Sequence, residues 1–162
     1  MHTAARRSAV FEKTRRRRPP RFGGVLRIST VNLWVHDQDV ALEFWTAKVG
    51  FELRADATFP ELGSFRWLTV GPPGQPDVEL VLMAVPEPPV LTKAQTGVVR
   101  AAMSQGLAGA VFLVTDDVER DFREFSDRGV EFTEPPERRP YGIDAGFRDP
   151  SGNQVRLTQE LS

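Results

Sequence analysis

Two distant stretches of the chain have apolar residues at every second position, as in a strand, and a helix-like pattern follows each one. In the first stretch Val31, Leu33 and Val35 alternate with Thr30, Asn32 and Trp34, and in the second Ala110, Phe112 and Val114 are the matching set. An Asp-containing turn comes next in both places, where an aspartate can accept hydrogen bonds from the first free N–H groups of a helix. Apolar positions then recur at helical spacing: Val40, Ala41, Phe44 and Trp45, and later Val118, Phe122 and Phe125.

The segments after each predicted helix also match. Gly50 and Gly129 end the helices, because glycine adopts a left-handed conformation without a Cβ clash. The pattern then predicts a short strand, a variable loop, and two strands joined by a Gly/Pro turn. The last two strands span 64–70 and 78–83 in the first copy, and 145–148 and 154–159 in the second. Each copy is therefore predicted to be a βαβββ unit.

Direct alignment supports an internal duplication. Residues 33–53 align with residues 112–132 at a constant offset of 79, which places Asp37 on Asp116 and Gly50 on Gly129. Near the end of each copy the offset falls to 77 and aligns Glu79 with Arg156. We expect a tail at 1–24, a first module at 25–84, a linker at 85–107 with a short helix over 93–104, and a second module at 108–162.

Composition and charge narrow the class of protein. The 162 residues are 40% hydrophobic and 27% charged, as in a soluble globular protein, and no apolar run approaches the roughly 20 residues of a membrane span. The lack of cysteine excludes disulfides and thiolate sites and favours a cytoplasmic location. Residues 1–24 hold eight Lys or Arg and one Glu, which leaves 13 basic against 21 acidic residues in the body. We interpret the tail as disordered, and an acidic body makes nucleic acid an unlikely partner.

Several of these stretches resemble the vicinal oxygen chelate superfamily, which includes glyoxalase I, bleomycin-resistance proteins and extradiol dioxygenases. The resemblance lies in LWVHDQDVALEFWTAKVGFEL, in the ending GVEFTEPPERRPYGIDAGFRDPSGNQVRLTQ and in the repeat itself, over about residues 25–160. It implies an α+β fold in which two tandem βαβββ modules form a curved, cup-shaped mixed sheet with helices outside. Members commonly form homodimers.

Metal-using members of this superfamily bind a divalent ion with one residue from the first strand and one from the last strand of each module. The corresponding positions here are Thr30, Gly109, Glu79 and Arg156, of which only Glu79 is a usual ligand. Arg156 is a hydrogen-bond donor only and would repel a cation. We expect no metal site and no cofactor, and hypothesise that a Glu79–Arg156 ion pair takes the place of the metal.

Strand alternation then predicts which residues face the cup. If Thr30 points inward, so do Asn32 and Trp34, while Val31, Leu33 and Val35 face the helices. The predicted ligand-binding residues are Thr30, Asn32, Trp34, Trp67, Glu79, Tyr141 and Arg156. Phe59 and Pro60 are candidates for a lid, and His36 is expected at the surface.

Three functions stay open at this point. The first is binding of a small molecule in the cup without the usual metal, similar to bleomycin-resistance proteins. The second is a lyase, isomerase or dioxygenase that uses a divalent metal through Glu79 and unusual ligands. The third is a regulatory or interaction module that acts through the basic tail. No catalytic residue is predicted.

Overall fold

The computed structural model describes residues 26–161, and its elements repeat in two halves. They follow in the order β1 (Thr30–Val35), α1 (Gln38–Glu43), a π-helical turn η2 (Phe44–Lys48), β2 (Glu52–Phe59), a 3-10 turn η3 (Pro60–Leu62), β3 (Phe65–Gly71), β4 (Glu79–Ala84), α2 (Lys93–Ser104), β5 (Ala110–Thr115), α3 (Val118–Asp127), β6 (Phe132–Arg139), β7 (Gly142–Arg148) and β8 (Gln154–Glu160). The basic tail expected at residues 1–24 lies outside the described residues.

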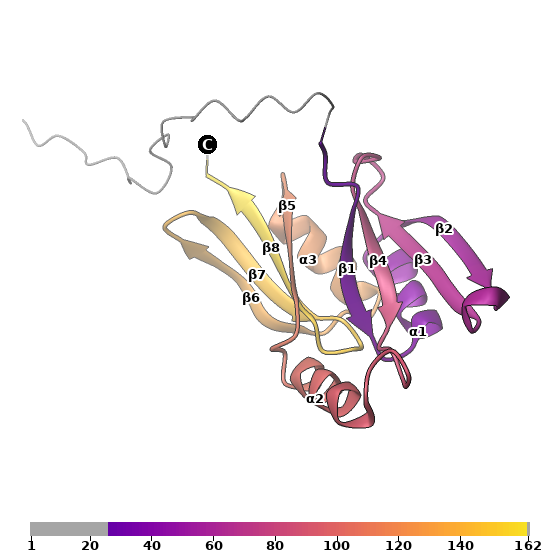
Figure 1. Ribbon diagram of the computed structural model, residues 1–162. Coiled ribbons are helices and arrows are strands. Elements are labelled where there is room, and N and C mark those ends of the chain that lie inside the picture. Colours follow the sequence, from indigo (N-terminus) through magenta and orange to yellow (C-terminus); the bar gives the residue numbers. More distant parts are fainter. Residues whose placement is uncertain (1–25, 162) are drawn as a thin grey trace, which may run out of the picture.

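The described strands form two mixed four-stranded sheets of identical topology. Their strand orders are β1-β4-β3-β2 and β5-β8-β7-β6, with β1 parallel to β4, β5 parallel to β8 and the other neighbours antiparallel. Both sheets stay open, and α1 and α3 lie behind them in Figure 1, while α2 joins the two halves at the base. The predicted α+β fold of two βαβββ modules is confirmed.

One hydrophobic core joins the two modules on the helix side of the sheets. It includes Leu33 and Val35 of β1, Val155 and Leu157 of β8, and aromatic residues from both halves. The rings of Phe44 and Phe147, one from each module, lie 6.2 Å apart between centroids. Because aromatic side chains bury large apolar areas, this shared core couples the stability of the modules.

The helix caps correct the alignment made from the sequence. Asp37 caps α1, accepting hydrogen bonds from the N–H groups of Asp39 and Val40, whereas α3 is capped by Asp117, not Asp116. The offset between the modules is therefore 80 at the caps and 79 at Gly50 and Gly129. The first helix accommodates its extra residue in the π-helical turn, where the N–H of Val49 donates to the carbonyl of Phe44.

The one-residue shift also changes which strand positions are equivalent. Thr30 lies beside Glu79 in the first sheet, and the matching pair in the second sheet is Ala110 and Gln154. Arg156 lies instead beside Phe112. The predicted equivalence of Glu79 and Arg156 is therefore wrong, because the turn before the last strand is two residues shorter in the second module and the offset there is 75, not 77.

Several local predictions also differ from the structure. The segment expected as a loop after residue 53 continues as β2 up to Phe59, and β6 extends to Arg139, since both strands pair with their neighbours along most of this length. Phe59 and Pro60 therefore belong to a strand end and the turn η3, not to a lid loop. Val31 and Val40, expected to face the core, are each about half exposed.

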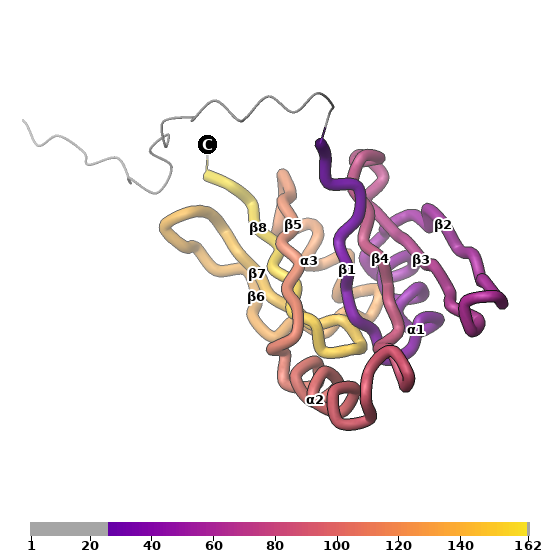
Figure 2. Tube along the Cα trace, in the orientation of Figure 1, coloured from indigo at the N-terminus to yellow at the C-terminus, as the bar shows by residue number. Residues whose placement is uncertain are grey.

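A tight turn between β7 and β8 holds the two modules together. Within the turn the Asp149 carboxylate accepts hydrogen bonds from the main-chain N–H groups of Ser151 and Asn153. The side chains of Ser151 and Asn153 then contact the main chain after and within β1, through the N–H of His36 and the carbonyl of Trp34. We call residues 149–153 the clasp. Figure 2 shows this yellow turn beside the lower end of β1.

Candidate functional site

The seven predicted ligand-binding residues fall on the faces of the two sheets that point away from the core, but in two groups. Thr30, Asn32 and Trp34 alternate along β1 with the buried Leu33 and Val35. Glu79 of β4 lies beside Thr30, and Trp67 of β3 shares this face because its neighbour Leu68 points into the core. Arg156 belongs to β8 of the second sheet, and Tyr141 lies in the turn between β6 and β7.

Arg156 is at the centre of a polar cluster on the outer face of the second sheet. Its guanidinium forms an ion pair with the buried carboxylate of Asp144 and a second one with Glu134, with an N–O distance of 3.0 Å. Thr158 donates a hydrogen bond of 2.8 Å to Asp144, and the Tyr141 hydroxyl lies 3.3 Å from the same carboxylate. The ion pair expected between Glu79 and Arg156 is not formed: no ion pair among residues 26–161 includes Glu79.

Gly146 makes room for this arrangement. It lies opposite Arg156 in the pairing of β7 with β8, and a Cβ atom at residue 146 would come within 2.5 Å of a terminal nitrogen of the guanidinium. Real side chains do not tolerate this distance. The guanidinium can therefore lie against the strand only because residue 146 is a glycine.

Hydrogen bonds and opposite charges keep Asp144 and Arg156 ionised. Burial opposes ionisation of Asp144, but hydrogen bonds from Arg156 and Thr158 and the charge of Arg156 outweigh it, so that the pKa of Asp144 is below its usual value. The hydrogen bond to Asp144 in turn raises the pKa of Arg156, against the effect of burial. Both groups are thus ionised at neutral pH.

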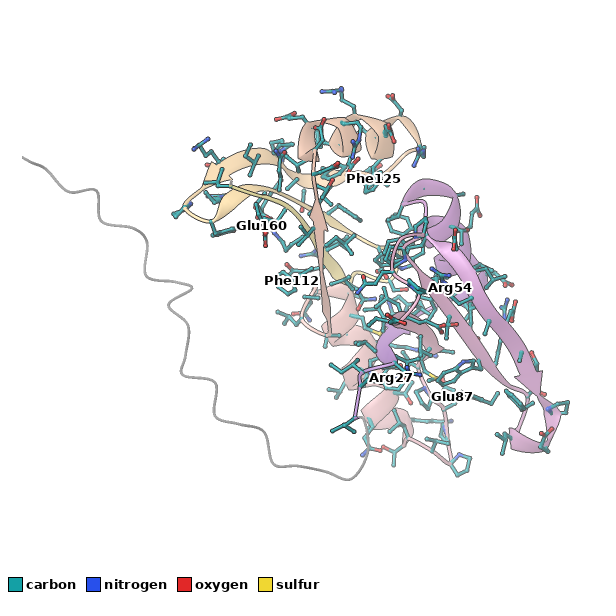
Figure 3. The ribbon with its side chains drawn as sticks, turned by 90° about the horizontal axis from the view of Figure 1, so that it is seen from above. Arg27, Arg54, Glu87, Phe112, Phe125 and Glu160 are labelled. Carbon is teal, nitrogen blue, oxygen red and sulfur yellow. The ribbon has the colours of Figure 1, made fainter. Side chains whose placement is uncertain are left out.

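A pocket of about 290 Å³ lies above this cluster. It is lined by Ala110, Phe112, Tyr141, Asp144, Gln154, Arg156 and Thr158. Phe112 is 76% exposed and Tyr141 is 55% exposed, which is unusual for two aromatic residues beside one pocket. In Figure 3 Phe112 points away from the α3 side of the sheet, where Phe125 lies.

The sequence predicted Tyr141 and Arg156 in this site but missed Phe112, Asp144 and Glu134. The alignment of Asp37 with Asp116 pairs Phe112 with Leu33, which is expected to face the helices, and so points Phe112 to the helix side. With Asp117 as the cap, the alternation places Ala110, Phe112 and Val114 on the outer face. Two adjacent aspartates, at 116 and 117, could each cap α3, and each choice gives a different alignment of β5 with β1.

A second cavity, of about 510 Å³, separates the modules at the far end of β5. Its walls include Val49 and Phe51 after η2, Pro72 and Gln75 in the turn between β3 and β4, and Phe125 of α3. Most of this surface is apolar, and Phe112 contributes to it as well as to the pocket above Arg156.

The residues level with Glu79 on the outer faces include few side chains that bind metal ions. We call a row the paired residues at equivalent positions of the two sheets. The first row is the pair of Thr30 and Glu79 with the pair of Ala110 and Gln154. The next row, two residues further along the strands, is the pair of Asn32 and Val81 with the pair of Phe112 and Arg156. One carboxylate is the only charged oxygen ligand in the first row, and the second row has none. Within residues 26–161 no group of three or more His, Asp and Glu side chains is placed to hold a metal ion.

Comparison with known proteins identifies the family. The sequence model of the Glyoxalase/Bleomycin resistance protein/Dioxygenase superfamily matches residues 27–157. The chain belongs to this superfamily. The described part of this superfamily member contains no helix long and apolar enough to cross a membrane.

Three known proteins are similar to this chain over nearly their whole length. The protein YurT of Bacillus subtilis (strain 168) is 31% identical over 135 residues, which is 83% of this chain and 100% of YurT. The crystal structure of UcmS2 is 39% identical, with a TM-score of 0.76, and the match covers 83% of this chain and 98% of UcmS2. TnmS3, an antibiotic binding protein from Streptomyces sp. CB03234, is 31% identical with a TM-score of 0.65, over 85% of this chain and 98% of TnmS3.

Proposed function

We propose that this protein binds a small organic molecule, without a metal ion, in the pocket above Arg156. The observation that carries the proposal is the combination of a fixed polar floor with two exposed aromatic residues, Phe112 and Tyr141. Ligand sites are typically apolar hollows with a few positioned polar groups, and this pocket has that composition. The relationship to TnmS3, an antibiotic binding protein, supports a ligand of that kind.

The proposal extends to the first sheet and to a second copy of the chain. Thr30, Asn32, Trp34, Trp67 and Glu79 form a second polar and aromatic face, which would make the rest of the ligand site. The edge strand β5 exposes Val114, at 70%, and a homodimer would cover it. The cytoplasmic location expected from the sequence stays a prediction.

Calorimetric titration with a panel of aromatic antibiotics tests the proposed function. We expect saturable binding by at least one of these compounds, and a loss of affinity of about tenfold or more in Phe112→Ala, because an aromatic wall contributes contact area that alanine lacks. The control is Val98→Ala on α2, a site that is also exposed but lies away from the pocket. Unchanged affinity in Phe112→Ala would overturn this assignment of the site.

A further inference from the structure

The guanidinium of Arg156 forms ion pairs with two carboxylates of the protein. One terminal nitrogen pairs with Asp144 and the other with Glu134, and both carboxylates come from neighbouring strands of the same sheet. A guanidinium whose charge is already balanced by two protein carboxylates gains less from pairing with a carboxylate or phosphate of a ligand. An arginine in a pocket would otherwise suggest an anionic ligand, and here it does not.

One side of the same guanidinium is closed by the protein. It lies against Gly146, where any side chain would displace it. Because Arg156 also lines the pocket, the side away from Gly146 is the one that a ligand can contact. Guanidinium planes stack well on aromatic rings, and Phe112 and Tyr141 stand beside this surface.

The charges on the face around the pocket sum to a small negative excess. The outer face of the second sheet presents three arginines and four carboxylates: Arg139, Arg148, Arg156, Glu134, Glu137, Asp144 and Glu160. Arg139 is itself paired with Glu137 at 2.8 Å. Figure 3 shows Glu160 on the same outer side of the sheet as Phe112. An anionic ligand would therefore find no net positive charge on this face to attract it.

From these observations we infer that the pocket selects planar aromatic molecules that carry no negative charge, stacked on the guanidinium of Arg156. This inference rests on the proposed function, since it names the class of ligand for the same site. Two preferences follow from it: one for a flat ring over a saturated one, and one for a neutral or cationic group over an anionic one.

Four naphthalene-sized probes separate the two preferences. The pair 2-naphthamide and decahydro-2-naphthamide differs in planarity at constant charge, and the pair 2-naphthylmethylammonium and 2-naphthoate differs in charge on the same ring system. We expect calorimetry on the full-length protein to show binding about tenfold weaker for the saturated amide than for 2-naphthamide, and about tenfold weaker for 2-naphthoate than for the ammonium probe.

Two variants assign these preferences to the residues named. Arg156→Lys keeps the positive charge but removes the plane, so it should reduce the preference for 2-naphthamide over its saturated analogue and leave the charge preference in place. Glu134→Gln should lower the preference for the ammonium probe over 2-naphthoate by about threefold without changing the planarity preference. Glu61→Gln, on the turn η3, is the matched control and should change neither.

The outcomes distinguish this inference from the proposed function. Equal or tighter binding of 2-naphthoate overturns the inference, and so does a failure of all four probes, while antibiotic binding that is sensitive to Phe112 would still support the function. If Arg156→Lys does not fold, the ratios measured on the unmodified protein and on Glu134→Gln decide the result by themselves.

Discussion

The side-chain amide of Asn153 donates a hydrogen bond of 2.8 Å to the main-chain carbonyl of Trp34, 119 residues earlier in the chain. The same amide donates to the carboxylate of Asp149, so that a single side chain links the clasp to strand β1 of the other module. Asn153 is 1% exposed, and water cannot replace these bonds if they are lost.

Asn153→Ala should therefore lower the free energy of unfolding by about 2–3 kcal/mol, because it leaves buried groups of Trp34 and Asp149 without their partner. Urea denaturation measures the change. Asn32→Ala, an exposed asparagine on β1, should stay within about 0.5 kcal/mol of the unmodified protein. Equal losses in the two variants would show that the clasp does not hold the modules together.

Gly152 is predicted to be the least replaceable glycine of the clasp. Its φ of +89° is in the left-handed region, and a Cβ there would come within 2.1 Å of the main-chain oxygen of Met103 in α2. Gly152→Ala should cost at least about 2 kcal/mol in thermal or urea unfolding. Gly74→Ala places its methyl group in open space and should be nearly neutral. A neutral Gly152→Ala would contradict the contact between clasp and helix.

The pH dependence of stability should reveal the ion pair between Asp144 and Arg156. Because the pKa of Asp144 is lowered in the folded protein, its contribution is fully present above its unfolded value of about 3.9 and is lost as the pH falls through the lower folded value. Asp144→Asn should thus be less stable at pH 7, by about 2 kcal/mol, and the difference should shrink on acidification below about pH 4.

The control for this experiment is Asp77→Asn, an exposed position in the turn before β4. Other carboxylates titrate in both proteins alike, so the difference between variant and unmodified protein isolates Asp144. A stability gap that stays constant between pH 7 and pH 3 would contradict an ionised Asp144.

Metal content gives a direct test of the metal-free proposal. Elemental analysis of protein purified without a polyhistidine tag should find substoichiometric nickel, manganese, zinc and iron, because the rows around Glu79 offer a single carboxylate. Incubation with each ion should not change this. One equivalent of a transition metal that is lost in Glu79→Ala would favour the metal-dependent enzyme over the binding protein.

The proposed homodimer depends on the exposed edge of the second sheet. Val114→Lys adds a charge to edge strand β5, where Val114 is 70% exposed, and should shift the protein toward monomer in sedimentation experiments without lowering its thermal stability at low concentration. Val90→Lys, in the linker and equally exposed, is the control. A monomeric unmodified protein at high micromolar concentration would end this part of the proposal.

The architecture could be predicted from the sequence because it depends on local patterns. Alternation identified Leu33 and Val35 as core residues, glycines ended the helices, and duplication revealed two modules. The register between modules could not be predicted, because the extra residue of the first helix is absorbed by a π-helical turn that has no clear signature in the sequence.

The candidate site was predicted only in part, for the same reason. Tyr141 and Arg156 were identified, but the faces of β5 depended on which of two adjacent aspartates caps α3, so the alignment pointed Phe112 to the wrong side. The partners of Arg156 depend on pairing across strands that bulges shift by a residue. Alternation alone therefore could not predict that Asp144 and Glu134 form ion pairs with Arg156.

The clasp occurs in only one of the two copies, and this asymmetry bears on protein engineering. The corresponding turn of the first module, GPPGQP, has no equivalent of Asn153 and instead borders the cavity between the modules through Pro72 and Gln75. Because the clasp alone makes these contacts between the modules, the turn between β3 and β4 can be replaced without breaking them. Loops of different length or composition grafted between β3 and β4 would alter the wall of that cavity while the fastening at residues 149–153 stays in place.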